Sequence, residues 1–105
     1  MARVSTHVLD TAHGRPASGI RVRLYDEQHR LLRDAATNPD GRIAEPIEVP
    51  IGVYELVFAV GEYFGAQGTP FLGDVIVRFG IEDPGAKYHV PLLVSPYGYT
   101  TYRGS

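Results

Sequence analysis

The sequence has 105 residues, close to the most common size of one domain, so we expect a single domain over residues 1–105 and no second core. The absence of cysteine excludes disulfide bonds and thiolate zinc sites, so hydrolytic chemistry would rest on His, acidic, hydroxyl or Arg side chains. A net charge of -2, with basic residues scattered along the chain, argues against nucleic acid or a membrane as the partner and favours a small-molecule substrate.

The first residues, from Met1 to His7, become polar at once and lack the apolar stretch of a secretory signal. No segment approaches the roughly 20 apolar residues that cross a bilayer. We therefore expect a soluble, cytoplasmic protein.

Short β-strands are predicted along most of the chain. Between Ile20 and Tyr25, apolar residues alternate with two arginines, which is typical of a strand with one buried face. The same reasoning predicts strands at Val4 to Leu9, Val53 to Val60, Val75 to Phe79, Tyr88 to Val94 and Tyr99 to Arg103. Turn residues such as Asn38 to Gly41 separate these runs. The pattern predicts an all-β fold, an antiparallel two-sheet β-sandwich of about seven or eight strands.

One segment favours a helix instead of a strand. Residues 61–68 contain Glu62 to Phe64 but also three glycines, which would keep any helix short. We expect one short helix near residues 62–67.

The four histidines are His7, His13, His29 and His89, and none lies at a spacing that supplies two metal ligands from one element. No metal site is therefore expected. His13 and His29 lie beside turn signals, which predicts solvated loop histidines. His7 and His89 each interrupt a predicted strand, where a histidine is often just partly exposed. Strand position alone leaves a structural role and a catalytic role open for both.

Arg42 directly follows the turn from Asn38 to Gly41, so it is either a solvated turn residue or a guanidinium aimed across the end of a sheet. The C-terminal segment from Ser95 to Ser105 is rich in tyrosine up to its end, whereas chain termini normally fray. A final strand packed into a sheet or a subunit interface explains these tyrosines without any catalytic role.

Three segments carry a resemblance to known proteins. They are Ser5 to Thr11 with Gly14 and Pro16, then Thr37 to Arg42, and finally Tyr88 to Ser105, which ends in Tyr-Arg-Gly-Ser. Together they resemble the 5-hydroxyisourate hydrolases, a family that shares the transthyretin fold. The last segment is similar to the diagnostic ending of that family almost residue for residue, and the resemblance spans essentially the whole chain. It implies a transthyretin-like sandwich.

The resemblance also implies an activity and a set of site residues. The expected reaction is hydrolysis of 5-hydroxyisourate to 2-oxo-4-hydroxy-4-carboxy-5-ureidoimidazoline in urate degradation, with no metal or organic cofactor. The residues at the family's functional positions are His7, Arg42, His89 and Ser105 as catalytic groups, with His7, Arg42, Tyr102 and Arg103 binding the substrate. A homotetramer is also implied, a dimer of dimers whose active sites lie at the dimer-dimer interface and take residues from facing subunits.

These residue types suit the implied chemistry. Two imidazoles with pKa values near neutrality can take a proton from water and return one to the leaving nitrogen. The guanidinium of Arg42 can stabilise oxygen charge as a tetrahedral intermediate develops. Tyr102 offers stacking or a hydrogen bond, and Ser105 offers a hydroxyl and the terminal carboxylate.

Two other functions compete with hydrolysis. A non-catalytic carrier of the transthyretin kind would have the same fold, but such carriers lack the combination of His7, Arg42, His89 and the Tyr-Arg-Gly-Ser ending. A carbohydrate-binding or protein-binding β-sandwich module from a larger protein is the second alternative. The polar strand histidines and the absence of linkers argue against it.

Overall fold

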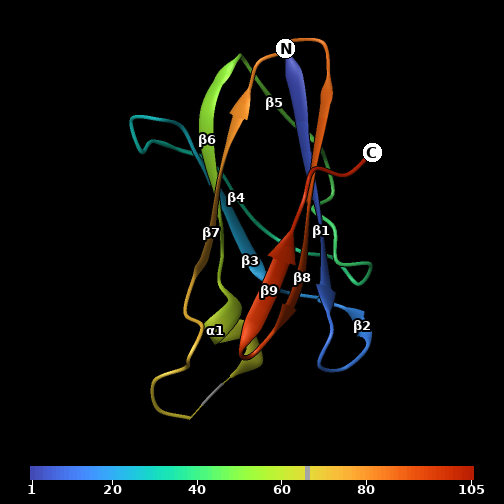
Figure 1. The fold of residues 1–105 in the computed structure, drawn as a ribbon, viewed down its shortest axis with the longest axis vertical. Helices are drawn as coiled ribbons and strands as arrows, with labels where there is room; N and C mark the ends of the chain where they lie inside the picture. The colour runs from blue at the N-terminus through green and yellow to red at the C-terminus, as the bar shows by residue number, and fades with distance from the viewer. Residues whose placement is uncertain (66) are drawn as a thin grey trace.

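The computed structural model describes residues 1–65 and 67–105 and shows two facing β-sheets (Figure 1). The described residues form nine strands and one helix, in this chain order: β1 (Ala2–Asp10), β2 (Arg15–Pro16), β3 (Arg21–Tyr25), β4 (Leu31–Ala36), β5 (Ile47–Val49), β6 (Gly52–Phe58), α1 (Val60–Phe64), β7 (Val75–Ile81), β8 (Lys87–Ser95) and β9 (Gly98–Thr101). The predicted all-β sandwich is therefore confirmed.

The strands divide between the sheets in a way that the sequence pattern did not predict in full. One sheet has the order β2-β1-β8-β9, with β5 also paired to β1, and the other has the order β4-β3-β6-β7. Strands β1 and β8 run parallel, from Arg3 opposite Lys87 to Asp10 opposite Val94, whereas the other named pairs of the described chain are antiparallel. The period of a strand reveals its buried face but not the direction of its neighbour.

Some element boundaries differ from the prediction. Strands β2, β4 and β5 were not predicted, because β4 is exposed at nearly every position and β2 and β5 have only two and three residues. The helix covers Val60–Phe64 instead of residues 62–67, because Gly65 adopts a left-handed conformation (φ 62°) and its N–H bonds to the Glu62 carbonyl, which ends the helix. The part of the predicted range at residue 66 lies outside the described residues.

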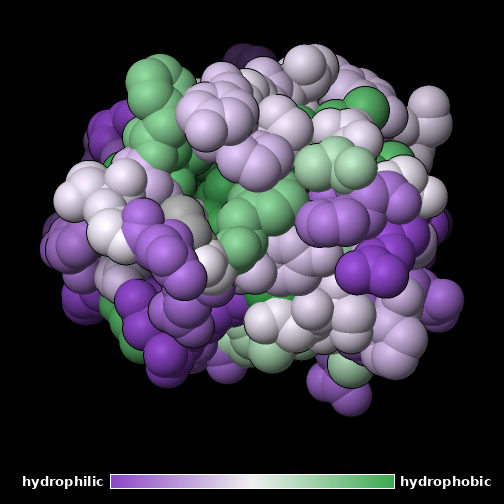
Figure 2. Space-filling model, turned by 90° about the horizontal axis from the view of Figure 1, so that it is seen from below, coloured by the Kyte–Doolittle hydropathy of each residue, from purple (hydrophilic) through white to green (hydrophobic). Residues whose placement is uncertain are grey.

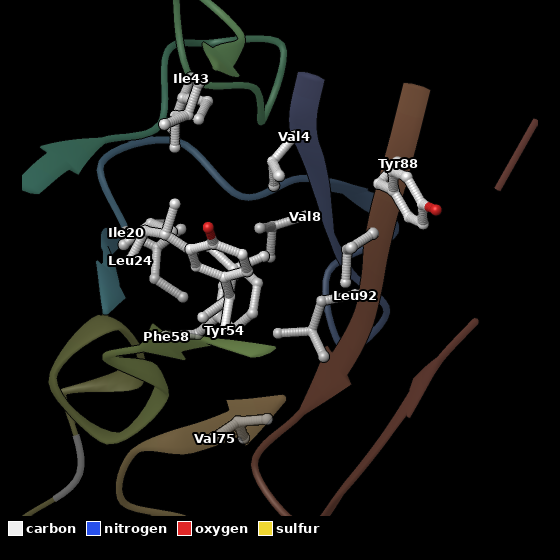
Figure 3. Close-up of a cluster of buried hydrophobic side chains, with 14 of the residues drawn as sticks. Val4, Val8, Ile20, Leu24, Ile43, Tyr54, Phe58, Val75, Tyr88 and Leu92 are labelled. Atoms are coloured by element: carbon white, nitrogen blue, oxygen red, sulfur yellow. The ribbon is translucent and has the colours of Figure 1, made fainter. Parts of the chain in front are cut away.

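The core lies between the two sheets, where large apolar side chains are fully buried (Figure 3). Even-numbered residues of β1, among them Val4 and Val8, point into this core, and β8 contributes Leu92. Burial of each such side chain contributes about 1.5–3 kcal/mol, so the orientation of both strands is strongly specified. The odd-numbered side chains consequently lie on the outer face of the sheet, His7 and His89 among them.

The end of the sandwich that carries α1 has both apolar and polar surface (Figure 2). Apolar surface lies at the centre of this view, and more polar residues surround it. Among the exposed apolar residues of the molecule, Phe71 packs against Tyr97 with ring centres 5.9 Å apart. Within the described residues, no helix is long and apolar enough to cross a membrane.

Candidate active site

The backbone holds Arg42 next to His7. A single antiparallel bridge pairs these two residues, and the Val8 N–H donates to the Gly41 carbonyl over 2.8 Å. Gly41 has φ 78°, and a Cβ there would collide with the Val8 carbonyl oxygen and lie 3.3 Å from Cδ2 of the His7 ring. Glycine is therefore required at this position for both conformation and space.

The turn before Arg42 fixes the position of the Arg42 backbone. The side-chain oxygen of Asn38 accepts hydrogen bonds from the N–H groups of Asp40 (3.0 Å) and Arg42 (3.1 Å). The Asn38 N–H in turn donates to the Arg42 carbonyl over 2.8 Å. An Asx turn of this kind leaves the Arg42 backbone little freedom, although its side chain is exposed.

His89 lies on β8, directly opposite Ser5 of β1. Nδ1 of its half-buried ring is 2.9 Å from the Ser5 hydroxyl oxygen. On the other side of β8, the Gly104 N–H donates to the His89 carbonyl over 2.8 Å, and a Cβ on Gly104 would lie 2.6 Å from Cδ2 of the ring. The C-terminal segment therefore packs directly against this histidine.

The electrostatics also connect three of the four candidate catalytic residues, His7, Arg42 and His89. Burial lowers the pKa of His89 below its usual value of 6.5, and electrostatic repulsion from Arg42 and His7 lowers it further. Arg42 is bridged to His7 of β1, and β1 pairs directly with β8, which carries His89. The structure thus brings His7, Arg42 and His89 together on one outer face and holds His89 in the neutral form near neutral pH.

The C-terminal residues divide between two places. Ser105 is exposed and adjoins Gly104, beside His89. Arg103 instead lies over the Tyr88 ring, 4.1 Å from its centre, and donates to the Lys87 carbonyl over 3.3 Å. Tyr102 and Arg103 both line a groove of about 320 Å³ whose other walls include Val77 and Phe79 of β7. Within one chain, these two predicted substrate-binding residues therefore belong to the groove between β7 and β9.

A second polar cluster was missed by the sequence analysis. Asp10 is 1% exposed, and its carboxylate accepts hydrogen bonds from the backbone and ring of His13 (3.0 and 2.7 Å) and from the Tyr63 hydroxyl (2.8 Å). Burial acts to raise the pKa of Asp10, but the hydrogen bonds from His13 and Tyr63 outweigh it and lower the pKa. His13 is half exposed, as expected for a loop histidine, and the cluster borders a cavity of about 490 Å³.

His29 lies in a turn with φ 62° and stacks on Tyr25, with ring centres 4.4 Å apart. Among residues 1–65 and 67–105, no three His, Cys, Asp or Glu side chains are grouped so that they could hold a metal ion.

Comparison with known proteins adds to this geometry. Residues 4–104 match the family model described as HIUase/Transthyretin family. The chain belongs to this family. A member from Rhizobium meliloti, named 5-hydroxyisourate hydrolase 2, is 51% identical, and the match covers 98% of this chain and 96% of that protein.

Solved structures of HIUase/Transthyretin proteins agree with the fold. The 5-hydroxyisourate hydrolase of Klebsiella pneumoniae has a TM-score of 0.87 and 35% identity, and covers 100% of this chain and 94% of that one. Sea bream transthyretin in complex with thyroxine has a TM-score of 0.86 and 27% identity, covering 96% and 93%. The family thus contains a named hydrolase and a named ligand-bound transthyretin on one fold, so the side chains of the site must distinguish the functions.

Proposed function

We propose that this protein hydrolyses 5-hydroxyisourate and opens its six-membered ring to give 2-oxo-4-hydroxy-4-carboxy-5-ureidoimidazoline. The observation that carries the proposal is the gathering of His7, Arg42 and His89 on one outer face of the β1–β8 pair. The names of the similar proteins from Rhizobium meliloti and Klebsiella pneumoniae support the same substrate.

The proposed mechanism uses the three side chains in sequence. A neutral imidazole takes a proton from water while the oxygen of that water attacks a ring carbonyl carbon, and the same or the other imidazole returns a proton to the leaving nitrogen as the carbon–nitrogen bond breaks. The depressed pKa of His89 supports a role as base, because the unprotonated form prevails near neutral pH. The guanidinium of Arg42 hydrogen-bonds the oxygen that becomes negative in the tetrahedral intermediate.

The terminal residues have less direct support. Ser105, next to Gly104 and His89, offers a hydroxyl and the carboxylate near the ring. Tyr102 and Arg103 lie in the β7–β9 groove of their own chain, so we propose that they bind substrate at a site of a neighbouring subunit. Their role in the proposal therefore depends on assembly.

We also propose that the chain forms a homotetramer, a dimer of dimers with sites at the dimer-dimer interface. Strands β7 and β9 end their respective sheets, so each carries an edge with unpaired backbone groups, and a largely apolar groove lies between them. Edges of this kind are suited to pairing with a second copy. Light scattering after gel filtration should give four times the chain mass of 11.5 kDa, and a monomer would contradict the assembly.

A carrier function is the second candidate, supported by the similarity to thyroxine-bound sea bream transthyretin. The outer face at β1 and β8 carries two histidines and an arginine, and such polar groups favour an ionised, hydrogen-bonding substrate over an apolar hormone. A carrier would bind thyroxine without accelerating any hydrolysis.

The test is direct. Freshly generated 5-hydroxyisourate is mixed with the purified protein, and its ultraviolet absorbance is followed against the spontaneous decay and against heat-denatured protein. We expect decay that is faster in proportion to protein concentration. A decay equal to the spontaneous rate, together with saturable thyroxine binding, would favour the carrier instead.

A further inference from the structure

The His89 ring is held on two of its edges. On the β1 side, the Ser5 hydroxyl oxygen lies 2.9 Å from Nδ1. On the other side, the Gly104 backbone lies so close that a Cβ there would be 2.6 Å from Cδ2 and 3.3 Å from Cγ. These contacts leave the far end of the ring, with Nε2, as the part that can meet a substrate.

The hydrogen bonding of the two ring nitrogens supports this orientation. Nε2 of His89 has no hydrogen-bond partner in the described part of the chain, and none of the fully buried side-chain nitrogens and oxygens there lacks a partner. Nε2 is therefore in contact with solvent space, because a buried nitrogen without a partner would be costly. The two ring nitrogens consequently have different tasks, one bound to the protein and one open.

The chemistry of imidazole then fixes the direction of the Ser5 hydrogen bond. When Nε2 accepts a proton, the ring passes from neutral to imidazolium, and when it releases that proton the ring returns to neutral. Nδ1 carries a hydrogen in both states, since a neutral ring with a free lone pair on Nε2 must be protonated on Nδ1. A partner that accepts from Nδ1 throughout the cycle is therefore required, and a serine hydroxyl oxygen is an acceptor.

We propose that Ser5 is a positioning residue for the hydrolysis: its hydroxyl oxygen accepts the Nδ1–H of His89 and so presents the lone pair of Nε2 to the reacting water. This inference rests on the proposed function for its kinetic consequence. The orientation of the ring stands on the structure alone. Without the hydroxyl, the tautomer with its hydrogen on Nε2 becomes populated, and only the Gly104 side still restrains the ring.

The experiment compares three variants of the full chain, namely Ser5→Ala, Ser5→Thr and the control Ser95→Ala. Ser95 lies on the same strand as His89, but its hydroxyl donates to the Gly98 carbonyl over 3.3 Å. We expect Ser5→Ala to lower kcat by about 10- to 100-fold with little change in KM, because a misplaced catalytic group costs rate and leaves ground-state binding. Ser5→Thr restores the hydroxyl and should recover most of the rate, and Ser95→Ala should match the wild type.

A spectroscopic measurement separates positioning from packing. Nitrogen-15 NMR of the His89 ring should show one tautomer, protonated on Nδ1, in the wild type and a mixture in Ser5→Ala. Full activity of Ser5→Ala, loss of rate in Ser5→Thr equal to that in Ser5→Ala, or a wild-type ring protonated on Nε2 would each overturn the proposal. If Ser5→Ala does not fold, the threonine variant and the wild-type spectrum still decide it. A wild-type protein that fails to accelerate hydrolysis refutes the function, while the spectrum continues to test the pairing.

Discussion

Two regions of this molecule use histidine in opposite ways. At the end near α1, His13 donates to the buried carboxylate of Asp10, which also accepts from Tyr63. On the outer face of β1 and β8, His89 meets a serine hydroxyl and lies in the field of Arg42 and His7, and no carboxylate bonds to it in the described chain. The first arrangement stabilises a buried charge, and the second keeps an imidazole neutral and open on one nitrogen.

The two regions differ in how burial and neighbouring groups shift the pKa of the titratable side chain. Hydrogen bonds from His13 and Tyr63 overcome the effect of burial and lower the pKa of Asp10, so the acid is permanently ionised at neutral pH. For His89, burial and neighbouring positive charge act in the same direction, so the base form is available at neutral pH. We therefore expect substitutions in the first region to change stability and substitutions in the second to change rate.

The largest expected effect is on activity. His89→Ala removes the proposed proton-transfer group and should lower kcat/KM by about 10²- to 10⁴-fold, with similarly large losses for His7→Ala and Arg42→Ala and with the proposed tetramer retained. His13→Ala is the matched control and should keep the rate, measured by ultraviolet decay of 5-hydroxyisourate. A near wild-type rate in any of the three active-site variants would remove that residue from the mechanism. A large loss of rate in His13→Ala would show that the Asp10 cluster also affects catalysis.

Next in size is the effect of the buried acid on folding. Asp10→Ala leaves the Tyr63 hydroxyl and the His13 backbone N–H without their acceptor, so the free energy of unfolding should fall by about 3 kcal/mol. Tyr63→Phe removes one hydrogen bond and should cost about 1 kcal/mol. Urea titration followed by circular dichroism measures both values. Equal stability of Asp10→Ala and the wild type would show that the cluster is not a stabilising element.

A smaller effect on rate is expected at the C-terminal segment. Gly104→Ala places a Cβ against the His89 ring, so the ring must shift and the rate should fall by about 10- to 100-fold. Gly98→Ala is the control, because a Cβ there meets only the Ser95 hydroxyl oxygen at 4.0 Å. The ultraviolet assay and a thermal melt distinguish loss of rate from loss of fold. Two alanine variants with the same rate would mean that Gly104 does not support the ring.

The smallest expected effect is a shift in titration. Because the folded pKa of His89 lies below 6.5, the unfolded chain binds more protons between the two values, and stability contributed by this group rises with pH through that window. The acid limb of kcat/KM should correspondingly lie below pH 6.5. Arg42→Gln removes one of the positive charges and should raise the His89 pKa in an NMR titration. An unchanged pKa would leave burial and His7 as the causes of the lowered value.

Asp10 should show a dependence of the same sign in a more acidic range. Its folded pKa is lowered from 3.8, so its stabilisation is present above that value and is lost as the pH falls through the folded pKa. The acid unfolding curve of Asp10→Ala should lack this component.

The sequence alone determined the sandwich, because short alternating runs separated by turn residues bury their apolar faces against a second sheet. It also placed His7 and His89 on strands, but the outward direction of their side chains came with the structure, in which Val4, Val8 and Leu92 face the core. The sequence resemblance also named Arg42 and the C-terminal residues. It did not predict the exposed edge strand β4, whose pattern carries no buried face.

Only the tertiary structure decided which residues meet. Ser5 lies two positions from His7 in the chain, yet its partner is His89, because the parallel register of β1 and β8 joins residues 84 positions apart. The same holds for Gly104 against the His89 ring and for Asp10 with Tyr63. Local periodicity fixes the face of each strand, but the register that pairs two distant strands comes from packing of the whole core, and that register assembles the proposed site.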